Sequence, residues 1–357
     1  MKRFKTSTAV LLRPLMVVAT LAVVMLLGAC KKDSISSNHQ EVLNVRNNGA
    51  DMPAYVHGNA ASKTFVIVVH GGPGGNGLEY RSGTYAEQLE EKVAMVYWDQ
   101  RGQGMSHGKY STNDVTIGQM ADDLYALVNI VKHRYGSDSK VYLLGHSWGG
   151  TLTAAFMTRK HYQHSVDGWI EANGAHDLPM LNKSAVEMFR TIGQDHINRG
   201  VNADQWQPIV DFANSVDPNN ISVEQAGEIN GHGHTAEGLV DAVRQGSGAA
   251  GGLIKYVFAS PTNPLTSALS GSATSNLLLQ EVEAANYTPQ LKNITVPCLF
   301  LWGRYDFVVP PELGYSAYAE VSSAQKELVI FEESGHSPMD NEPDKFVDEV
   351  LDFVQAR

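Results

Sequence analysis

The stretch that decides the fold is Lys-Val-Tyr-Leu-Leu-Gly-His-Ser-Trp-Gly-Gly, residues 140–150. A strand-like apolar run, 140–144, leads directly into Gly145-His146-Ser147-Trp148-Gly149, and an apolar helical segment follows to about residue 162. A strand that turns sharply into a helix strains the backbone at the serine, and small residues two places before and after it relieve the clash. The pattern predicts that the Ser147 hydroxyl is exposed at a helix N-terminus, where the helix dipole favours developing negative charge.

Similar apolar runs alternate with helical periodicity on both sides of this stretch. The further strand-like runs lie at residues 65–69, 93–98, 168–172, 296–302 and 326–331. Strands that are apolar throughout and alternate with helices are typical of a parallel sheet covered on both faces. The sequence therefore predicts an α/β fold with a mainly parallel sheet. The loops after its strands are expected to meet at one edge, where sites form.

The strand-and-helix pattern is interrupted between residues 177 and 290. This segment is richer in Asn, Gln, Ser and Gly, and it contains the loose stretch 246–252. The pattern resumes before the last two strands, which indicates one sheet with an insertion. We predict a core formed by residues 41–176 and 291–357, with residues 177–290 as a mainly helical lid over the loop edge. A separate second domain is the alternative.

Two later loops supply the groups that a nucleophilic serine requires. A serine hydroxyl is a weak nucleophile and needs a base, which in turn needs an orienting acid. On a strand–turn–helix serine of this kind the chain order is serine, acid, histidine. Asp306 follows the apolar run that ends at Trp302, and His336 lies in a turn after the last run. The sequence predicts Ser147, Asp306 and His336 as nucleophile, orienting acid and base.

The glycine-rich segment His70-Gly71-Gly72-Pro73-Gly74-Gly75 follows the strand-like run 65–69. Acyl transfer needs two backbone N–H groups aimed at the oxyanion, and the residue after the nucleophile, Trp148, supplies one of them. We predict that Gly72 supplies the other, with Gly71 as the second choice. Because no Gly-Lys-Ser/Thr follows, a phosphate-binding loop is disfavoured. His70 is expected to be a structural hydrogen-bonding residue.

Several motifs together resemble those of one known family. They are His70 to Gly74, the element Asp99-Gln100-Arg101-Gly102-Gln103-Gly104-Met105-Ser106, Gly145 to Gly150, Gly303 to Asp306, and Gly335 to Ser337. In combination they resemble the proline iminopeptidase family of α/β-hydrolases over roughly residues 60–175 and 290–357, and the Asp-Gln-Arg-Gly element discriminates best. The resemblance implies an α/β-hydrolase fold, a Ser-Asp-His triad, no metal, and release of an N-terminal residue from short peptides.

The insertion departs from that resemblance. Family members that trim peptides hold the free amine of the substrate with acidic groups, some of them from the lid, but no such lid motif is recognisable here. Glu171, Glu187, Glu228 and Glu237 are candidates, although each taken alone is typical of a solvated acid. An esterase or amidase for small acyl compounds is therefore the alternative enzyme, and a non-catalytic lipid-anchored binding protein is the alternative of another class. Haloalkane and epoxide chemistry is excluded, because it requires an aspartate where Ser147 stands.

Composition limits the ligands. The net charge of −11 over 357 residues argues against a nucleic-acid partner, which requires a basic face. His232-Gly233-His234, which we expect in a glycine-rich loop, has no paired acid or cysteine at ligand spacing and is a weak indication of a metal. We therefore expect no metal and no other cofactor. The expected partner is a small peptide or a small acyl substrate.

The N-terminus has the pattern of an export signal. Lys2, Arg3 and Lys5 precede an apolar run at 15–29, which is too short to span a membrane stably. The run ends in Leu-Gly-Ala-Cys, which resembles the bacterial lipobox. We predict a lipoprotein signal peptide at residues 1–29, lipidation of Cys30, and a flexible tether over 30–40. An ordinary signal peptide is the alternative.

The lipobox resemblance also predicts a location. A lipid on Cys30 would place the globular domain outside the cytoplasm in a bacterial cell envelope, attached to the membrane only through that lipid. The residue after it is Lys31 rather than an aspartate, which favours the outer membrane. Cys298, the second of the two cysteines, lies in a strand-like run and is expected to be buried in the core.

Overall fold

The computed structural model describes residues 35–159, 161–245 and 264–355. Residues Ser37–Arg357 form one compact unit, which contains all the helices and strands given below. The predicted signal peptide, Cys30 and the stretch 246–252 lie outside the described residues. Within the described ranges, every helix is too short or too polar to cross a membrane.

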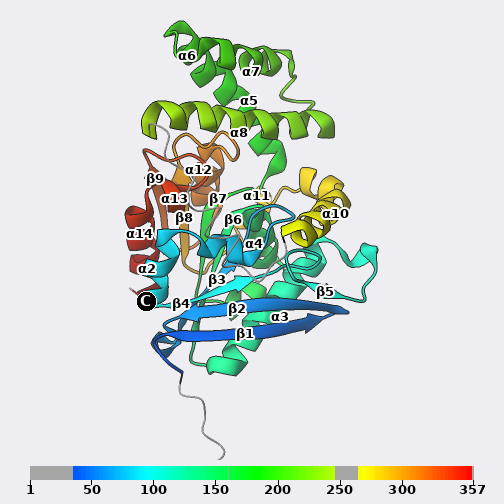
Figure 1. The fold of residues 1–357 in the computed structure, drawn as a ribbon, viewed down its shortest axis with the longest axis vertical. Helices are drawn as coiled ribbons and strands as arrows, with labels where there is room; N and C mark the ends of the chain where they lie inside the picture. Colours follow the sequence, from blue (N-terminus) through cyan, green and yellow to red (C-terminus); the bar gives the residue numbers. More distant parts are fainter. Residues whose placement is uncertain (1–34, 160, 246–263, 356–357) are drawn as a thin grey trace, which may run out of the picture. The chain divides into compact units, whose positions relative to one another are not determined.

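Nine strands of the described residues form one sheet, in the order β1-β2-β4-β3-β6-β7-β8-β9 with β5 paired to β2 (Figure 1). Their bounds are β1 His39–Asn47, β2 Ala50–Gly58, β3 Thr64–Val69, β4 Ala94–Trp98, β5 His107–Gly108, β6 Lys140–Ser147, β7 Gly168–Gly174, β8 Cys298–Gly303 and β9 Lys326–Phe331. The six strands from β4 to β9 along this order are parallel, while β1, β2 and β5 are antiparallel. The prediction of a mainly parallel sheet is confirmed.

The parallel and antiparallel parts of the sheet have different burial. β4 and β8 are buried along their whole length, as expected of parallel strands covered on both faces. β1 is an edge strand in which exposed residues alternate with more buried ones, and only Leu43 and Val45 are fully inside. Because β1 begins at His39, the last two residues of the range predicted as a tether belong to the sheet.

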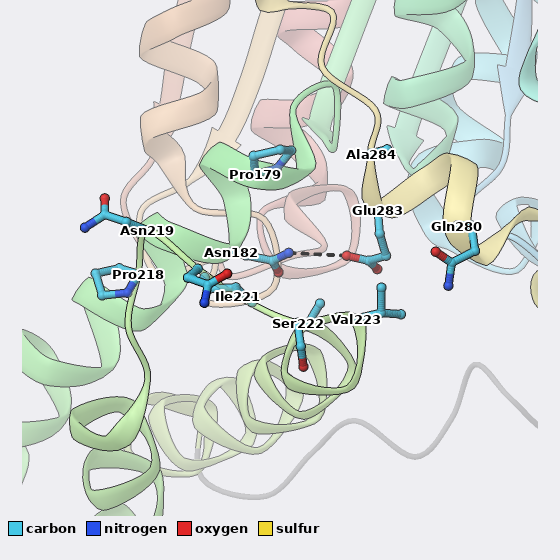
Figure 2. A pocket seen from close by; sticks show the side chains of 12 residues that line it. Pro179, Asn182, Pro218, Asn219, Ile221, Ser222, Val223, Gln280, Glu283 and Ala284 are labelled. Atoms are coloured by element: carbon cyan, nitrogen blue, oxygen red, sulfur yellow. Dashed lines mark hydrogen bonds between the residues drawn. The ribbon is translucent and has the colours of Figure 1, made fainter.

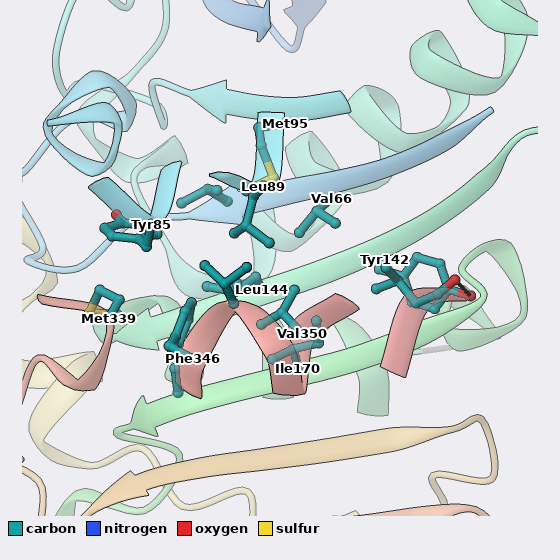
Figure 3. Close-up of a cluster of buried hydrophobic side chains, with 14 of the residues drawn as sticks. Val66, Tyr85, Leu89, Met95, Tyr142, Leu144, Ile170, Met339, Phe346 and Val350 are labelled. Carbon is teal, nitrogen blue, oxygen red and sulfur yellow. Dashed lines mark hydrogen bonds between the residues drawn. The ribbon is translucent and has the colours of Figure 1, made fainter. Parts of the chain in front are cut away.

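The helices cover both faces of the sheet and fill the insertion. Their bounds are α2 Thr84–Lys92, α3 Ile117–Tyr135, α4 Trp148–Thr158, α5 Leu178–Met188, α6 Gln194–Asn198, α7 Ala203–Ser215, α8 Val223–Gln245, α10 Pro264–Glu283, α11 Thr288–Leu291, α12 Pro311–Glu320, α13 Pro338–Asn341 and α14 Pro343–Gln355. On one face, α2 and α14 pack against β-strand residues such as Val66, Leu144 and Ile170 (Figure 3). On the other face, α4 contacts β7 through a 3.0 Å hydrogen bond from the Trp169 indole to Thr153.

The segment between β7 and β8 has a hydrophobic cluster of its own. Phe189, Trp206, Ile229 and Leu239 come from this segment, and Phe307 joins them from the loop after β8. Figure 1 draws α5, α6, α7 and α8 close together at the top of the view. The cluster therefore connects the inserted helices to the loop that carries Asp306.

Helix α8 corrects one sequence interpretation. His232-Gly233-His234 lies inside this helix and not in a loop. Glycine in a helix interior costs about 1 kcal/mol relative to alanine, but Ile229, Ala236 and Val240 of α8 are buried in the cluster. Gly233 also lies against Phe307, where an added Cβ would be 2.7 Å from the carbonyl oxygen. Tertiary packing outweighs the local propensity here.

Candidate active site

Ser147 occupies the turn between β6 and α4, and its backbone is strained. Its φ of 56° and ψ of −125° are rare for a residue with a side chain. The flanking glycines are required by close approach of the main chain. A Cβ on Gly149 would lie 1.9 Å from the carbonyl oxygen of Val69, and one on Gly145 would lie 2.5 Å from that of Gly149. Strand, turn and helix thus have the geometry predicted from the sequence.

Asp306 and His336 meet at the same edge of the sheet, on the loops after β8 and β9. His336 Nδ1 and Asp306 Oδ2 are 2.9 Å apart, and the Asp306 side chain is fully buried. The other carboxylate oxygen, Oδ1, accepts the N–H groups of Val308 at 2.9 Å and Val309 at 2.6 Å. Because the carboxylate occupies Nδ1, Nε2 is the ring nitrogen of His336 that is left to face another group.

Asn173 is a part of this site that the sequence analysis missed. It lies near the end of β7 with a φ of 47° and is fully buried. Its amide donates to Asp306 Oδ2 and, at 3.3 Å, to the carbonyl oxygen of Gly335. Asn173 therefore joins the loop of the acid to the loop of the histidine. Asparagine tolerates positive φ, but nothing in its sequence context indicates this contact.

His146 links the serine turn to the other two loops. Its Nε2 lies 2.7 Å from the carbonyl oxygen of His336, and its Nδ1 lies 2.6 Å from the Tyr80 hydroxyl. The Tyr80 hydroxyl in turn accepts the N–H of Gly71 at 2.8 Å. Burial, with a smaller contribution from the charge of His336, lowers the pKa of His146 to about 3. A neutral His146 fits these hydrogen bonds, because its Nε2–H can donate to the carbonyl oxygen of His336 while its Nδ1 accepts from the Tyr80 hydroxyl.

The glycine-rich loop lies beside Ser147. A Cβ on Gly71 would be 3.2 Å from that of Ser147, but the N–H of Gly71 is already donated to Tyr80. Gly72, with a φ of 128°, lines the same cavity as Ser147 and Trp148. Of the two glycines considered as oxyanion donors, Gly72 is thus the one that the hydrogen bonding favours.

The Asp99-Gln100-Arg101-Gly102 element is hydrogen-bonded to the glycine-rich loop. Gln100 donates from Nε2 to the carbonyl oxygen of His70 at 3.0 Å and accepts the Trp148 indole N–H at 2.8 Å. Arg101 and Asp123 form a fully buried ion pair at 2.7 Å. Burial lowers the pKa of His70 to about 4, so His70 is neutral and serves as a hydrogen-bonding residue of the loop.

A cavity of about 250 Å³ opens beside Ser147. Its apolar wall includes Leu178, Leu181, Leu279, Val282, Val308 and Val309. Its polar residues include Asn182, Asn230 and Glu283, besides Ser147, Thr151 and Ser275. The Asn182 amide donates to Glu283 at 3.3 Å, and both side chains also line a neighbouring pocket of about 360 Å³ (Figure 2). The cavity thus combines a hydrophobic wall with one acid.

The predicted acids lie elsewhere. Glu171 is fully buried and pairs with His176 at 2.9 Å, while Glu187 and Glu228 are exposed. Glu237 lies next to Asp306 and His336. None of these four is among the described residues that line the cavity with Ser147. Glu283, which does line it, was not identified because its distance from the motifs in sequence hides its position in space.

The two histidines of α8 point to different surroundings. His232 packs on Phe212, with ring centroids 4.6 Å apart, and His234 lies 6.4 Å from the His336 ring. Among the described residues, potential metal ligands gather at Glu237, Asp306 and His336, whose ligand atoms lie within 4.8 Å of one another. Asp306 and His336 already use these atoms to bond each other.

Helix α10 contacts the glycine-rich loop directly. An added Cβ on Gly271 would lie 2.1 Å from the carbonyl oxygen of Gly74. Ser275 donates to the carbonyl oxygen of Pro73, and Thr274 donates to that of Gly102 at 2.7 Å. The last residue of this same helix is Glu283. The inserted helices therefore touch the site from two sides, α10 at the glycine loop and α8 at the Asp306 loop.

The fold and the arrangement at the strand ends define the class of protein as an α/β-hydrolase. The profile described as serine aminopeptidase, S33, matches residues 60–224 and 264–344. Because this match covers more than half of the chain, the protein belongs to the serine aminopeptidase S33 family and is a hydrolase.

Individual relatives agree with the family. The chain is 26% identical over 305 residues to the protein named probable aminopeptidase YbaC of Bacillus subtilis (strain 168), covering 82% of this chain and 89% of that one. It is 27% identical over 291 residues to a proline iminopeptidase of Saccharolobus solfataricus, covering 81% and 84%. The structure of a proline iminopeptidase-related protein from Thermus thermophilus has the same fold, with a TM-score of 0.59, 18% identity, and coverage of 89% and 100%.

Proposed function

We propose that the protein is a serine aminopeptidase that removes the N-terminal residue from short peptides through an acyl-enzyme on Ser147. The observation that carries the proposal is that Ser147 and the acidic residue Glu283 line the same small cavity. The family and the aminopeptidase-named relatives support the same activity.

The first half of the reaction forms the acyl-enzyme. The Ser147 oxygen attacks the carbonyl carbon of the first residue, and His336 Nε2 takes the hydroxyl proton. Asp306, bonded to Nδ1 at 2.9 Å, holds the ring in the required tautomer and stabilises the imidazolium. The N–H groups of Gly72 and Trp148 bind the oxyanion. His336 then gives its proton to the leaving amine as the peptide bond breaks.

The second half of the reaction regenerates the enzyme. Water replaces the departed peptide, His336 removes a proton from it, and the resulting hydroxide attacks the ester carbonyl carbon. The same two N–H groups bind the second oxyanion. The Ser147 oxygen leaves with the proton from His336, and the free amino acid is released.

Glu283 is proposed to bind the α-amine of the substrate. An ammonium group inside a largely apolar cavity needs a carboxylate partner, because an unpaired buried charge is costly. The cavity volume of about 250 Å³ lies below the ~300–1,000 Å³ of most small-molecule sites, so one apolar residue fits better than a long acyl chain. Proline, the residue implied by the family resemblance, has this character.

Glu283→Gln is expected to impair only substrates with a free amine. The amide keeps the hydrogen bond with Asn182 but loses the charge, so KM for amino-acid naphthylamides should rise by about 10-fold or more. Hydrolysis of small nitrophenyl esters should change little. Burial raises the pKa of Glu283, against the effect of Asn182. In the wild type, KM for free-amine substrates should therefore also rise as acidic pH protonates this carboxyl.

Glu187→Gln is the matched control, because Glu187 is an exposed acid of the inserted segment, and it should leave both substrate types unaffected. An N-acetylated naphthylamide should be a poor substrate for the wild type. Equal hydrolysis of acetylated and free-amine substrates would favour the alternative, an esterase or amidase for small acyl compounds with the same machinery. A protein that binds these compounds but turns over none would be a non-catalytic binding protein.

The attachment of the protein is a separate proposal, supported by the sequence alone. The basic start, the apolar run at 15–29 and Cys30 support processing before Cys30 and lipidation of its thiol. Cells expressing the full chain should incorporate labelled fatty acid into it, and Cys30→Ala should lose both the label and membrane fractionation. Incorporation that persists in Cys30→Ala would refute lipidation at this residue.

A further inference from the structure

We propose that Glu237 is a neutral carboxylic acid that donates a hydrogen bond to the Asp306 carboxylate. It would be a positioning residue of the site, supplied by α8 from within the inserted segment. The inference rests on the proposed roles of Asp306 and His336 as orienting acid and base, and it adds to them a residue that the reaction does not itself require.

The geometry encloses the Glu237 carboxyl group between the two loops. Glu237 Oε1 accepts the main-chain N–H of Phe307 at 3.2 Å, and the carboxyl group also accepts the main-chain N–H of His336. A Cβ on Gly335 would be 3.1 Å from the Glu237 carboxyl carbon. The carboxyl groups of Glu237 and Asp306 are within hydrogen-bond reach of each other, and the cluster of Glu237, Asp306 and His336 spans less than 4.8 Å.

Two carboxyl groups in contact need a proton between them. Asp306 is buried and Glu237 is half-buried, and two carboxylates side by side in such surroundings repel, so the pair retains one proton. Asp306 accepts N–H groups from four residues, Val308, Val309, Asn173 and His336. Glu237 accepts N–H groups from two, Phe307 and His336. The negative charge is better stabilised on Asp306, which leaves the proton on Glu237.

The electrostatic surroundings favour the same assignment. Burial, followed by the charge of Asp306 and the hydrogen bond with it, raises the pKa of Glu237 to about 10. The titratable groups facing it are Asp306 and His336 from the two loops, with His234 from its own helix close to His336. The contact of Gly233 with Phe307 places α8 against the same loop. The inserted helix thus holds the acid of the site in place through one donated proton.

Two substitutions distinguish hydrogen-bond donation by Glu237 from a role of its side chain in packing and from a role of its charge. Glu237→Gln retains both functions, since its carbonyl can accept from Phe307 while its NH₂ donates to Asp306. Labelling of Ser147 by a fluorophosphonate should stay within about 3-fold of the wild type. Glu237→Leu removes the donor, and the labelling rate should fall by about 10-fold or more. Glu228→Gln, an exposed acid on the same helix, is the control.

A stability titration tests the proton without any activity. The pKa of Glu237 is near 4.5 in the unfolded chain and about 10 in the folded protein, so the folded state holds this proton more tightly. The stability that Glu237 contributes is therefore fully present at low pH and is lost as the pH rises towards the folded pKa of about 10. The Tm of the wild type relative to Glu237→Gln should fall steadily between about pH 5 and pH 9. The infrared difference spectrum between the wild type and Glu237→Gln should contain the band of one protonated carboxyl group.

The outcomes distinguish this proposal from the proposed function. A Tm difference that does not change with pH, or Glu237→Gln as slow in labelling as Glu237→Leu, would overturn the neutral donor. A raised KM in Glu237→Gln for free-amine substrates alone would mean that Glu237 binds the amine. If Glu237→Leu does not fold, the titration and the infrared difference spectrum of Glu237→Gln decide. Failure to hydrolyse peptides would leave the labelling and titration results valid, because neither uses a peptide substrate.

Discussion

Replacing Ser147 by alanine is expected to lower kcat by about 10,000-fold or more and to abolish fluorophosphonate labelling. The substitution removes the attacking oxygen and retains the Cβ, so the strained turn, with a φ of 56°, loses no packing. Turnover of a free-amine naphthylamide and mass spectrometry of the labelled protein measure the two effects. The residual rate should reflect the oxyanion donors and substrate binding alone.

Ser275→Ala is the matched control for this substitution. Ser275 lines the same cavity as Ser147, but its hydroxyl is donated to the carbonyl oxygen of Pro73. Its removal should change kcat by less than about 10-fold, since it costs one hydrogen bond away from the reacting atoms. Substantial turnover in Ser147→Ala, with a melting temperature like that of the wild type, would show that another residue carries the chemistry.

Asp306→Asn is expected to have the second largest effect, a loss of about 10,000-fold in kcat. Oδ1 accepts from the main-chain N–H groups of Val308 and Val309, so this position must remain an oxygen. The new NH₂ then replaces Oδ2, where the Asn173 amide and His336 Nδ1 both donate. His336 must turn Nδ1 into an acceptor, which places its proton on Nε2 and blocks it as a base. A pH–rate profile at saturating substrate measures the loss.

Asp306→Asn also distinguishes a change in the tautomer of His336 from a loss of folded structure. Asn and Asp have nearly the same shape, so the circular dichroism spectrum and the substrate KM should remain close to those of the wild type. A variant that keeps the wild-type kcat would contradict the role of Asp306 as orienting acid. It would also remove the basis for assigning Glu237 to the same network.

Much of the core could be predicted because its signals are local. The apolar runs that became β3, β4, β6, β7 and β8 are mostly buried, and such strands carry no polar alternation to confuse them with edge strands. The turn at Ser147 could be predicted from Gly145 and Gly149, because a side chain at either position would clash with the main chain. The order of serine, acid and histidine then followed from the loops after three of the predicted strands.

The features that were missed depend on contacts distant in sequence. β1 is an edge strand with mixed burial, so its pattern resembles a polar linker at its start. Asn173 and Glu283 are separated from Asp306 or Ser147 by tens of residues and carry no motif. Glu237 was named only as a candidate for binding the substrate amine, and its contact with Asp306 is equally distant in sequence. Helix α8 contains glycines that disfavour a helix locally, and its stability comes from burial against Phe189, Trp206 and Phe307. Only the folded chain brings these groups together.

The two inserted helices that touch the site give it separate properties. Helix α10 ends at Glu283 and, through Ser275, bonds the loop that carries Gly72, so under the proposed function it would combine amine recognition with support of the oxyanion loop. Helix α8 meets the loop of Asp306 through Glu237. Our proposals assign substrate choice and orientation of the base to different helices, so the variants at Glu283 and Glu237 should affect different kinetic parameters.

The most direct test of the central claim is the rate at which a fluorophosphonate labels the wild-type protein in the presence of a competing peptide. The account predicts a single adduct, located on Ser147 by peptide mass spectrometry. Increasing concentrations of a short peptide with a free N-terminal proline should slow its formation, while the N-acetylated form of that peptide should not. An adduct at another residue, or equal protection by both peptides, would contradict a serine aminopeptidase built on Ser147.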